Sequence, residues 1–429
     1  MFSLSELLTS PRWHRVRFGL GLGLILVGGF IARRAFNEWG HDLAQIYTAA
    51  LLLLEGKNVY DWGVQHDGYM RFIGWIPTWG HFYPPASSVF AVPVTVIPYP
   101  LLKQVWFFGS IALLFYGLWR FMAAYLPRWD YSLRTLALGV VMCCACIRWG
   151  FKVAQPGAIV LGMLGLFLAE LKERGRSWLL ALQAGLVLSI KFTFSLPFLI
   201  LLVAQRRLLA ASAAVAAWGA MNIIGIYGHG GLGILADYRA NMAVFERPDQ
   251  LNYPDPRGGN SLARTDWPYL LNAFKPDFHV NSLIGHGLTA LTALWLAWEI
   301  LRVRPAALRE DKSVLALAAP GAALTLLAVY HHHYDMCILL LPVLGYLGFA
   351  EFRALKAAWV YVAAVGLYAG CYPYAQFAAF LQSLVGDVSV LIAKPLATVV
   401  CIIALVSSMV VLRATLSPRV SAMPLDRDC

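Results

Sequence analysis

The sequence predicts an all-α polytopic membrane protein, and three observations support this fold class. The 429 residues are 59% hydrophobic and only 13% charged, whereas soluble domains carry about 25% charged residues. The mean hydropathy is +0.64. Apolar runs of about 15–20 residues, close to the length that crosses hydrocarbon as a helix, recur along nearly the whole chain. We therefore expect a single membrane domain over residues 1–429 with about 11–13 transmembrane helices.

The distribution of basic residues predicts the orientation of this domain. Arg12, Arg15 and Arg17 precede the first apolar run at 18–36, which places the N-terminus in the cytoplasm by the positive-inside rule. No small-residue cleavage site follows that run, so we interpret it as a retained span and not as a cleaved signal. The basic loops at 172–176, 205–207, 302–312 and 353–356, and the tail at about 413–429, then also fall on the cytoplasmic side.

The polar segments between the runs are expected on the external side, as loops at 37–83 and 227–282 and as the turn at 331–335. Within the first loop, HDLAQIYTAALLLLEGKNVYD has an apolar face at helical spacing, so we expect an amphipathic helix on the membrane surface that ends at Gly56. The Gly-, Pro- and Trp-rich stretch from there to Pro85 is expected to be an ordered loop. The later apolar runs lie at 86–98, 101–123, 134–149, 156–170, 177–190, 192–204, 208–226, 284–301, 313–330, 335–349, 357–372 and 388–412.

Counting spans from the two ends of the chain gives a disagreement in parity between residues 85 and 134. One short, proline-rich run in that region is therefore expected not to cross the membrane.

Charge and cysteine patterns exclude two other classes of function. The formal charge is +11, but the basic residues form short clusters between apolar runs and no single stripe, which favours membrane topology over nucleic-acid binding. None of the seven cysteines has a CxxC spacing, so neither a zinc site nor a disulfide framework is indicated. We expect no metal and no cofactor.

Ionisable residues at the ends of apolar runs are costly unless they are paired or functional, and here they gather on the predicted external side. They are Asp42, Lys152 and Lys191, with Gln155 nearby, Arg264 in the long loop, and His331, His332, His333 and Asp335 in the last turn. A carboxylate, imidazoles and several cations together suggest acid–base chemistry on an anionic, lipid-linked substrate.

Each candidate also has a simpler explanation. Asp42 could cap the surface helix, and Lys191 could extend its ammonium group to lipid phosphate. The histidine triplet could be an interfacial polar turn. Three adjacent histidines point about 100° apart on a helix, so a metal site built from them alone is disfavoured.

Several blocks of the sequence, in their order and spacing, resemble glycosyltransferase family 87. These blocks are HDLAQIYTAALLLLEGKNVYD, HFYPPASSVFAVPV, AQPGAIVLGML, AGLVLSIKFTFSLPFLI, GGNSLARTDWPYLL and YHHHYDMCILLLP. The third block departs from the family pattern at Pro156 and Gly157. The family belongs to the GT-C superfamily of enzymes that use polyprenyl-phosphate sugars, and it includes a mycobacterial phosphatidylinositol-mannoside mannosyltransferase.

The resemblance implies a GT-C fold with its active site on the external face of the plasma (inner) membrane. Asp42 would be the catalytic base, assisted by one of His331, His332 and His333. Lys191 and Arg264 would bind the phosphate, and Gln155 and Tyr83 would line the sugar pocket. Tyr47, Lys152, Asn260 and Asp335 complete the expected substrate-binding set.

The implied reaction transfers a sugar, mannose by analogy, from a polyprenyl-phosphate sugar to a hydroxyl of a lipid or glycan acceptor. A good leaving group, one base and several cations suit a single inverting displacement, because a retaining enzyme needs a second close carboxylate, for which only Asp335 is a candidate. We expect a monomer.

Two other functions fit a polytopic chain. A transporter or flippase of a lipid-linked or anionic solute would place its ionisable residues near mid-membrane, often within inverted repeats, and neither feature is visible here. An O-antigen ligase or polymerase would share the many spans and the long external loop, but the acidic residue directly after the first span argues against it.

Overall fold

The computed structural model describes residues 10–38, 40–77, 80–173, 175–245, 247, 253–256, 264–371 and 394–417. Within these ranges the regular structure is helical, apart from one isolated β-bridge between Arg264 and His332. Seven helical segments are long and apolar enough to cross a membrane. Their helices are α2 (His14–Glu38), α6 (Tyr99–Tyr125), α10 (Ser177–Lys191), α12 (Leu208–Gly228), α15 (Phe278–Leu301), α17 (Asp311–Ala328) and α23 (Leu396–Leu416). The protein is therefore an all-α polytopic membrane protein, as the composition predicts.

The described residues contain fewer long spans than the 11–13 expected. An eighth crossing is formed if α7 (Tyr131–Cys143) and α8 (Ala145–Lys152), which meet at a bend of 55°, count as one broken span. Other apolar runs form shorter helices, namely α9 (Gly157–Lys172), α11 (Leu196–Ala204), α18 (Leu340–Gly348) and α20 (Lys356–Cys371). The runs at 192–204 and 335–349 are each divided into a 3₁₀ turn and a short α-helix, whereas α9 and α20 are about as long as the runs that predicted them.

The apolar run at 86–98 does not form a span. It folds into α5 (Pro85–Ala91) followed by a 3₁₀ turn, η2 (Val92–Val94), because Pro93 and Pro98 cannot continue a helix. A seven-residue helix is only about 10 Å long. The run at 86–98 is therefore a short, proline-rich run whose helix is too short to cross the membrane.

The segment predicted to be the first external loop is more helical and more enclosed than the sequence suggests. The predicted surface helix forms as α3 (His41–Leu54), but most of its side chains are buried and not divided between a lipid face and a water face. The stretch expected to be a loop contains α4 (Trp62–Phe72), which Asp61 caps through its side chain. Gly68 of α4 faces Thr48 and Leu52, so α4 covers the side of α3 that would otherwise be exposed.

Glycines set the closest helix contacts in the bundle. A Cβ atom on Gly162 of α9 would lie 2.5 Å from the carbonyl oxygen of Leu113 in α6. One on Gly165 would lie 2.6 Å from the carbonyl oxygen of Gly117. Small residues that allow backbones to approach closely are typical of packing between membrane helices.

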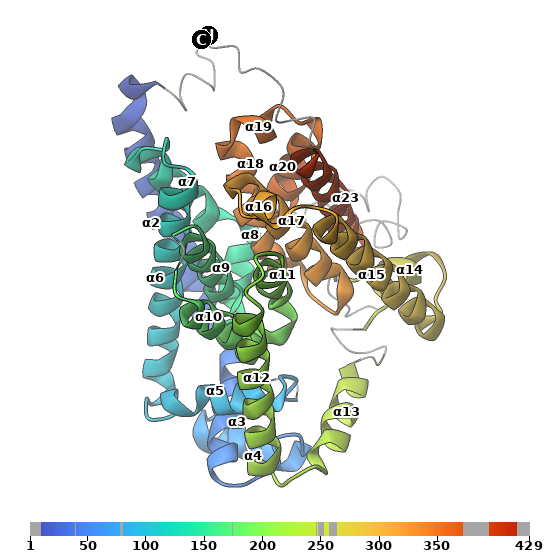
Figure 1. Ribbon diagram of the computed structural model, residues 1–429. Helices are drawn as coiled ribbons and strands as arrows, with labels where there is room; N and C mark the ends of the chain where they lie inside the picture. The colour runs from blue at the N-terminus through green and yellow to red at the C-terminus, as the bar shows by residue number, and fades with distance from the viewer. Residues whose placement is uncertain are drawn as a thin grey trace.

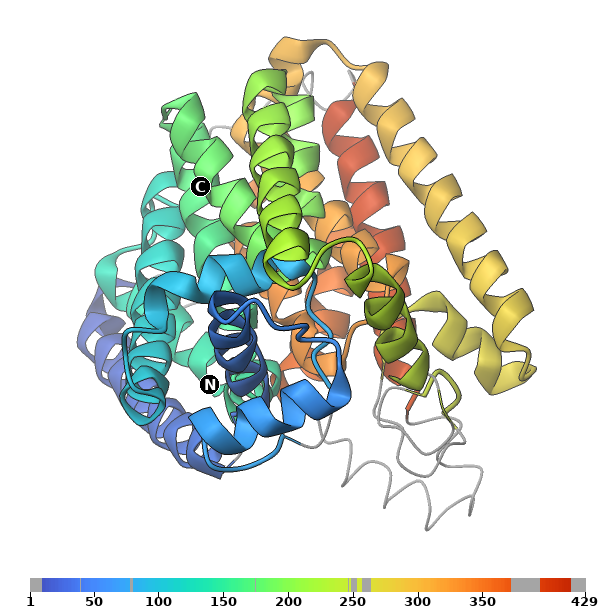
Figure 2. The same ribbon diagram turned by 90° about the horizontal axis from the view of Figure 1, so that it is seen from below.

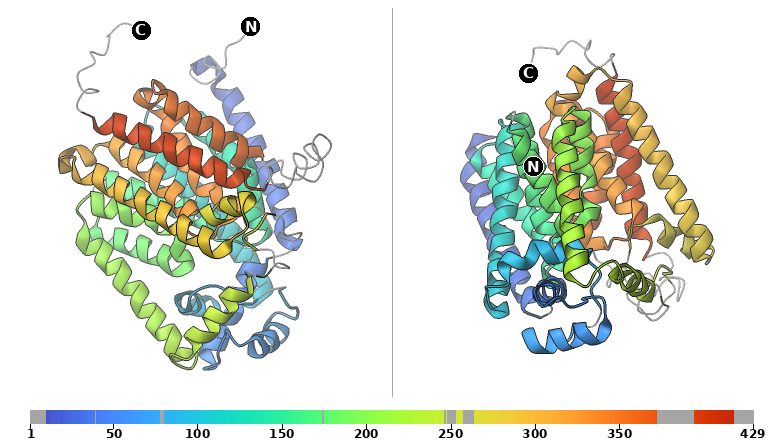
Figure 3. Two further views of the ribbon diagram at one scale, coloured as in Figure 1. Left: turned by 90° about the vertical axis from the view of Figure 1, so that its right-hand side faces the viewer. Right: turned by 60° about the horizontal axis from the view of Figure 1, so that its bottom comes forward.

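The helices arrange the polar segments at one end of the bundle (Figures 1 and 3). The helices α3, α4, α5 and α13 (Ile234–Phe245) gather there, and Figure 2 looks onto this end. The short α14 (Trp267–Phe274) precedes α15. The start of α2 and the short α19 (Ala350–Arg353) lie at the opposite end in Figure 1. The remaining elements are η1 (Pro11–Trp13), η3 (Phe192–Phe194), η4 (His333–Leu339) and α16 (Pro305–Leu308).

Candidate functional site

Asp42 is held in place by the backbone at the start of α3. Gly40 precedes the helix with a left-handed φ of +66°, a conformation that favours glycine. The amide of Gly40 donates to the carbonyl of Lys152 at 3.1 Å, and the amide of Asp42 donates to the carbonyl of Val153 at 3.0 Å. Since Gly40 is the N-cap residue and no side chain caps the helix, capping does not explain the Asp42 carboxylate.

Gln155 connects Asp42 to a second polar element. It follows the turn after α8, where Ala154 has a φ of +56° and the amide of Gln155 donates to the carbonyl of Gly150 at 2.8 Å. Its side chain accepts a hydrogen bond from Lys191 Nζ at 3.1 Å. It also lies close enough to Asp42 and to Tyr83 to lower the pKa of each.

Lys191 forms a buried ion pair with Asp335. Its ammonium nitrogen lies 2.8 and 2.9 Å from the two carboxylate oxygens, and the side chains are only 14% and 2% exposed. Lys191 therefore points into the protein and not to lipid phosphate. The pair joins the end of α10 to η4, two segments 144 residues apart.

The three histidines of the late turn lie in different surroundings. His331 Nδ1 is 2.8 Å from Asp335 Oδ2. His332 Nε2 is 2.7 Å from the Tyr330 hydroxyl, and its amide donates to Asp335 at 3.3 Å. The His333 ring contacts Trp149 edge-on, with centroids 5.6 Å apart. The His331 side chain contacts the Asp335 carboxylate, so we define the Asp42 network as Asp42, Gln155, Lys191, Asp335 and His331.

Burial changes the proton affinity of these groups. It raises the pKa of Asp42 to about 7. Lys191 and Gln155 oppose this rise, whereas the negative charge of Asp335 adds to it. Burial lowers the pKa of His331, although the hydrogen bond to Asp335 acts in the opposite direction. It lowers the pKa of His332 to about 3. A pKa in this range is the kind that suits a general base working near neutral pH.

Arg264 lies beside the Asp42 network but is already paired. Its guanidinium donates to both carboxylate oxygens of Asp266 at 2.8 and 2.6 Å, and both side chains are buried. It stacks over the Tyr330 ring at 4.9 Å, and its backbone forms the bridge with His332. Asp266 was not predicted as a site residue, although its position two residues after Arg264 was a signal for this ion pair.

The other predicted residues take separate positions. The Tyr47 hydroxyl donates to the carbonyl of Ile97 at 3.2 Å. Lys152 lies over the Trp149 ring, with Nζ 4.8 Å from its centroid. Asn260 lies outside the described residues.

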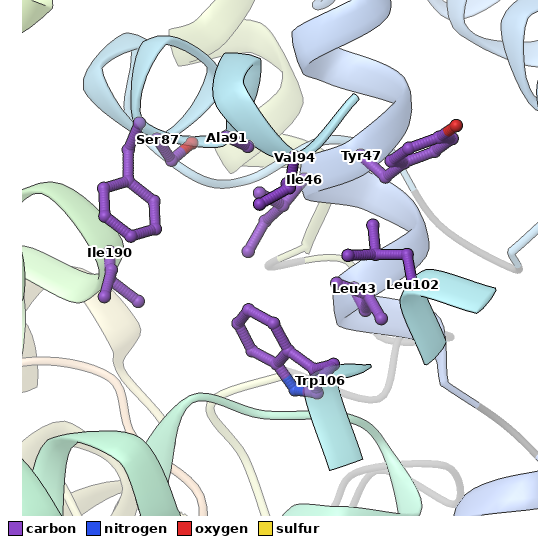
Figure 4. Close-up of a pocket in the computed structure, with 10 residues that line it drawn as sticks. Leu43, Ile46, Tyr47, Ser87, Ala91, Val94, Leu102, Trp106 and Ile190 are labelled. Atoms are coloured by element: carbon purple, nitrogen blue, oxygen red, sulfur yellow. The ribbon is translucent and has the colours of Figure 1, made fainter. Parts of the chain in front are cut away.

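An apolar pocket has a volume of about 130 Å³. Leu43 and Ile190, which line it and are labelled in Figure 4, are the chain neighbours of Asp42 and Lys191. The other lining residues, several of which are labelled around the open space in Figure 4, are Ile46, Tyr47, Ser87, Phe90, Ala91, Val94, Leu102 and Trp106.

A second buried polar group lies next to Tyr83 and was not predicted. His81 is fully buried, and neither of its ring nitrogens has a hydrogen-bond partner within the described part of the chain. Its ring lies 5.6 Å from that of Tyr60 and 5.9 Å from that of Tyr83. The Tyr60 hydroxyl donates to the carbonyl of Tyr83 at 2.8 Å. Unpartnered buried nitrogens are costly, so this cluster has unused capacity to bind a polar group.

Among the described residues, no group of three His, Cys, Asp or Glu side chains is placed to hold a metal ion.

Comparison with known proteins gives one match. The sequence model of glycosyltransferase family 87 matches residues 81–328, more than half of the chain. Neither the curated proteins nor the solved structures give a match. The matched range includes Tyr83, Gln155, Lys191 and Arg264, whereas Asp42 and the turn at 331–335 lie outside it.

Proposed function

Since the chain belongs to glycosyltransferase family 87, we propose that it transfers a sugar from a polyprenyl-phosphate sugar to a hydroxyl of a lipid or glycan acceptor. Family membership makes it a glycosyltransferase, and its apolar helices make it a multi-pass membrane protein. Under this proposal the reaction takes place at the end of the bundle formed by α3, α4 and α5, which faces the outside of the plasma (inner) membrane. Membership also favours transfer over transport.

The observation that carries the mechanism is the half-buried Asp42 carboxylate beside Lys191 and Gln155, with its pKa raised to about 7. In the proposed step the acceptor oxygen attacks the anomeric carbon, and its proton passes to Asp42. The bond from the anomeric carbon to the phosphate oxygen breaks, and its electron pair leaves with the phosphate. One attack from the face opposite the leaving group inverts the configuration.

The surroundings of Asp335 support a single displacement. A retaining reaction needs a second carboxylate free to attack the sugar. Asp335 instead accepts hydrogen bonds from Lys191 and from the amide of His332, and it contacts His331. These bonds occupy both of its oxygens, so we assign it the role of holding Lys191 and His331.

The leaving phosphate needs positive charge near it. Lys191 is the cation nearest to Asp42 in the network, and the negative phosphate of a bound donor would compete with Asp335 for its ammonium group. Arg264, fixed by Asp266, would add to the positive potential. Gln155 and Tyr83 would contact the sugar.

The apolar pocket beside the Asp42 network suits the lipid part of the substrate. A cavity of about 150 Å³ lined by apolar side chains stays dry and accepts a molecule the size of benzene. The pocket here is about 130 Å³, enough for roughly one five-carbon isoprenoid unit by that comparison. We assign it to the first unit after the phosphate, which also gives Tyr47 a role.

Replacement of Asp42 by Asn tests the mechanism, because the amide keeps the shape and removes the base. We expect transfer from polyprenyl-phosphate mannose in isolated membranes to fall by at least 100-fold, the lower end of general-base contributions. The matched control is Asp67→Asn, since Asp67 lies on α4 with its side chain 92% exposed. Full activity of Asp42→Asn would overturn the assignment, and activity with another sugar donor only would correct the sugar.

A further inference from the structure

A polar cleft of about 610 Å³ lies where α6, α9 and α11 end and where α10 and α17 begin. It is lined by Tyr125, Leu171, Lys172, Ser177, Gln205, Arg206, Arg207, Arg309, Asp311 and Val314. Ser177 begins α10 and Lys191 ends it. A helix of 15 residues is about 22 Å long, so the cleft and the Asp42 network lie at opposite ends of this helix. The cleft is therefore a separate site.

The cleft carries an excess of positive charge. Four cations line it, Lys172, Arg206, Arg207 and Arg309, against the single carboxylate of Asp311. Asp311 forms an ion pair with Lys172, whose Nζ lies 2.5 Å from the Asp311 carboxylate. Arg207 donates to the carbonyl of Gly175 at 2.9 Å, a bond that fixes its guanidinium without neutralising it.

Two other acidic residues near the cleft are paired with cations outside it. Glu173 pairs with Arg120 at 2.7 Å, and Glu310 pairs with Lys312 at 3.2 Å. The Glu170 carboxylate lies beside Gly175, on the side of the cleft where Arg207 is bound. Arg206 and Arg309 are both exposed, so their guanidinium groups are the ones an anion can reach.

The backbone at Arg206 is a second, independent observation. Arg206 has a φ of +56°, in the left-handed region that glycine usually occupies after a helix. Its amide donates to the carbonyl of Val203 at 2.9 Å, and the amide of Arg207 donates to that of Leu202 at 2.8 Å, the pattern of a helix-ending turn. Non-glycine residues are strained there, and such strain collects at ligand clamps. Arg206 therefore occupies a backbone conformation in which glycine would be less strained.

The surroundings indicate a lipid and not a soluble anion. Trp178, next to Ser177, is 60% exposed, and Leu208 and Leu209, next to Arg207, are 58% and 87% exposed. Exposed leucines belong in hydrocarbon, and exposed tryptophan is typical of the membrane interface. The cleft thus opens at the depth of phospholipid head groups. The guanidinium group of arginine can donate hydrogen bonds to two phosphate oxygens at once.

We propose that this cleft binds the phosphate of an anionic phospholipid in the leaflet opposite the Asp42 network. Arg206 and Arg309 contact the phosphate oxygens, Arg207 supports them from the helix end, and the acyl chains lie along Leu208 and Leu209. The site is independent of the transfer reaction, and its test does not use transfer activity.

The test measures lipid binding to the detergent-purified full chain by native mass spectrometry. Phosphatidylglycerol, phosphatidylcholine and inorganic phosphate are titrated separately. We expect phosphatidylglycerol to bind with one site per chain and with an affinity that falls as salt rises. Equal binding of phosphatidylcholine would overturn the recognition of charge, and saturation of the same site by inorganic phosphate at equal concentration would overturn the lipid assignment.

Two variants locate the site. We expect Arg206→Gly and Arg309→Gln each to weaken phosphatidylglycerol binding about fivefold, the effect of one cation near a lipid surface. Glycine relieves the strain at position 206, so Arg206→Gly should unfold at the same or a higher temperature, which separates lost binding from misfolding. The control is Arg128→Gln, an exposed cation in the short segment after α6. Unchanged binding in both cleft variants, or an equal loss in Arg128→Gln, would overturn the proposal.

Discussion

The ionisation of Asp42 predicts how transfer activity depends on pH. Burial raises the pKa of Asp42 to about 7, and a general base acts only when deprotonated. With that pKa, about one carboxyl group in eleven is ionised at pH 6 and about ten in eleven at pH 8. Activity measured as kcat/KM should therefore rise about tenfold from pH 6 to pH 8 and then level off.

Charges near Asp42 give the direction in which the midpoint should move. Lys191 lowers the pKa of Asp42 and Asp335 raises it. In Lys191→Gln the midpoint should therefore move above 7, and in Asp335→Asn it should move below 7, whatever the loss in maximum rate. A shift of one pH unit corresponds to about 1.4 kcal/mol.

The assay follows transfer of radiolabelled sugar from a polyprenyl-phosphate donor in membranes between pH 5.5 and 9, with Asp67→Asn as control. A rate independent of pH over this range would refute the role of Asp42 as base. Midpoints that move in the opposite directions in the two variants would refute the electrostatic account of its pKa.

Three further predictions concern stability, and thermal unfolding in detergent measures each of them. Lys191→Met should destabilise the protein by about 3–5 kcal/mol, because it leaves the buried Asp335 carboxylate without its cation. The double variant Lys191→Met, Asp335→Asn should lose much less stability than Lys191→Met alone. Additive losses of stability would contradict the pairing. Gly162→Ala should destabilise the protein by about 1–3 kcal/mol, since the new Cβ meets the α6 backbone, whereas Gly109→Ala, where a Cβ meets nothing within 4 Å, should be neutral or better. His81→Phe should keep or raise the unfolding temperature, because both ring nitrogens of His81 are buried without a partner among the described residues. A clear drop in the unfolding temperature would show that those nitrogens make hydrogen bonds in the folded protein.

The amino-acid sequence predicted the fold class and the family, and it proposed most members of the candidate site. Apolar runs long enough to cross hydrocarbon must become helices, because backbone polar groups find no partner in lipid. Ionisable residues at the ends of such runs stood out because burial there is costly. Asp42, Gln155, Lys191, Asp335 and His331 were all identified in this way or through the family resemblance, and all five lie in one network.

The pairing of the polar groups, and the choice of the apolar runs that become spans, depend on how distant segments fold against one another. The contact between Lys191 and Asp335 joins residues 144 positions apart, and no local pattern encodes such a partner. The same holds for the choice of His331 over its neighbours, because three adjacent imidazoles are equivalent in sequence and differ only in what packs against each. Apolar composition also cannot separate α5, which proline ends after two turns, from a true span, or reveal that α4 buries the second face of α3. These pairings and helix lengths depend on packing between distant segments. The periodicity of apolar residues within one segment carries no information about that packing.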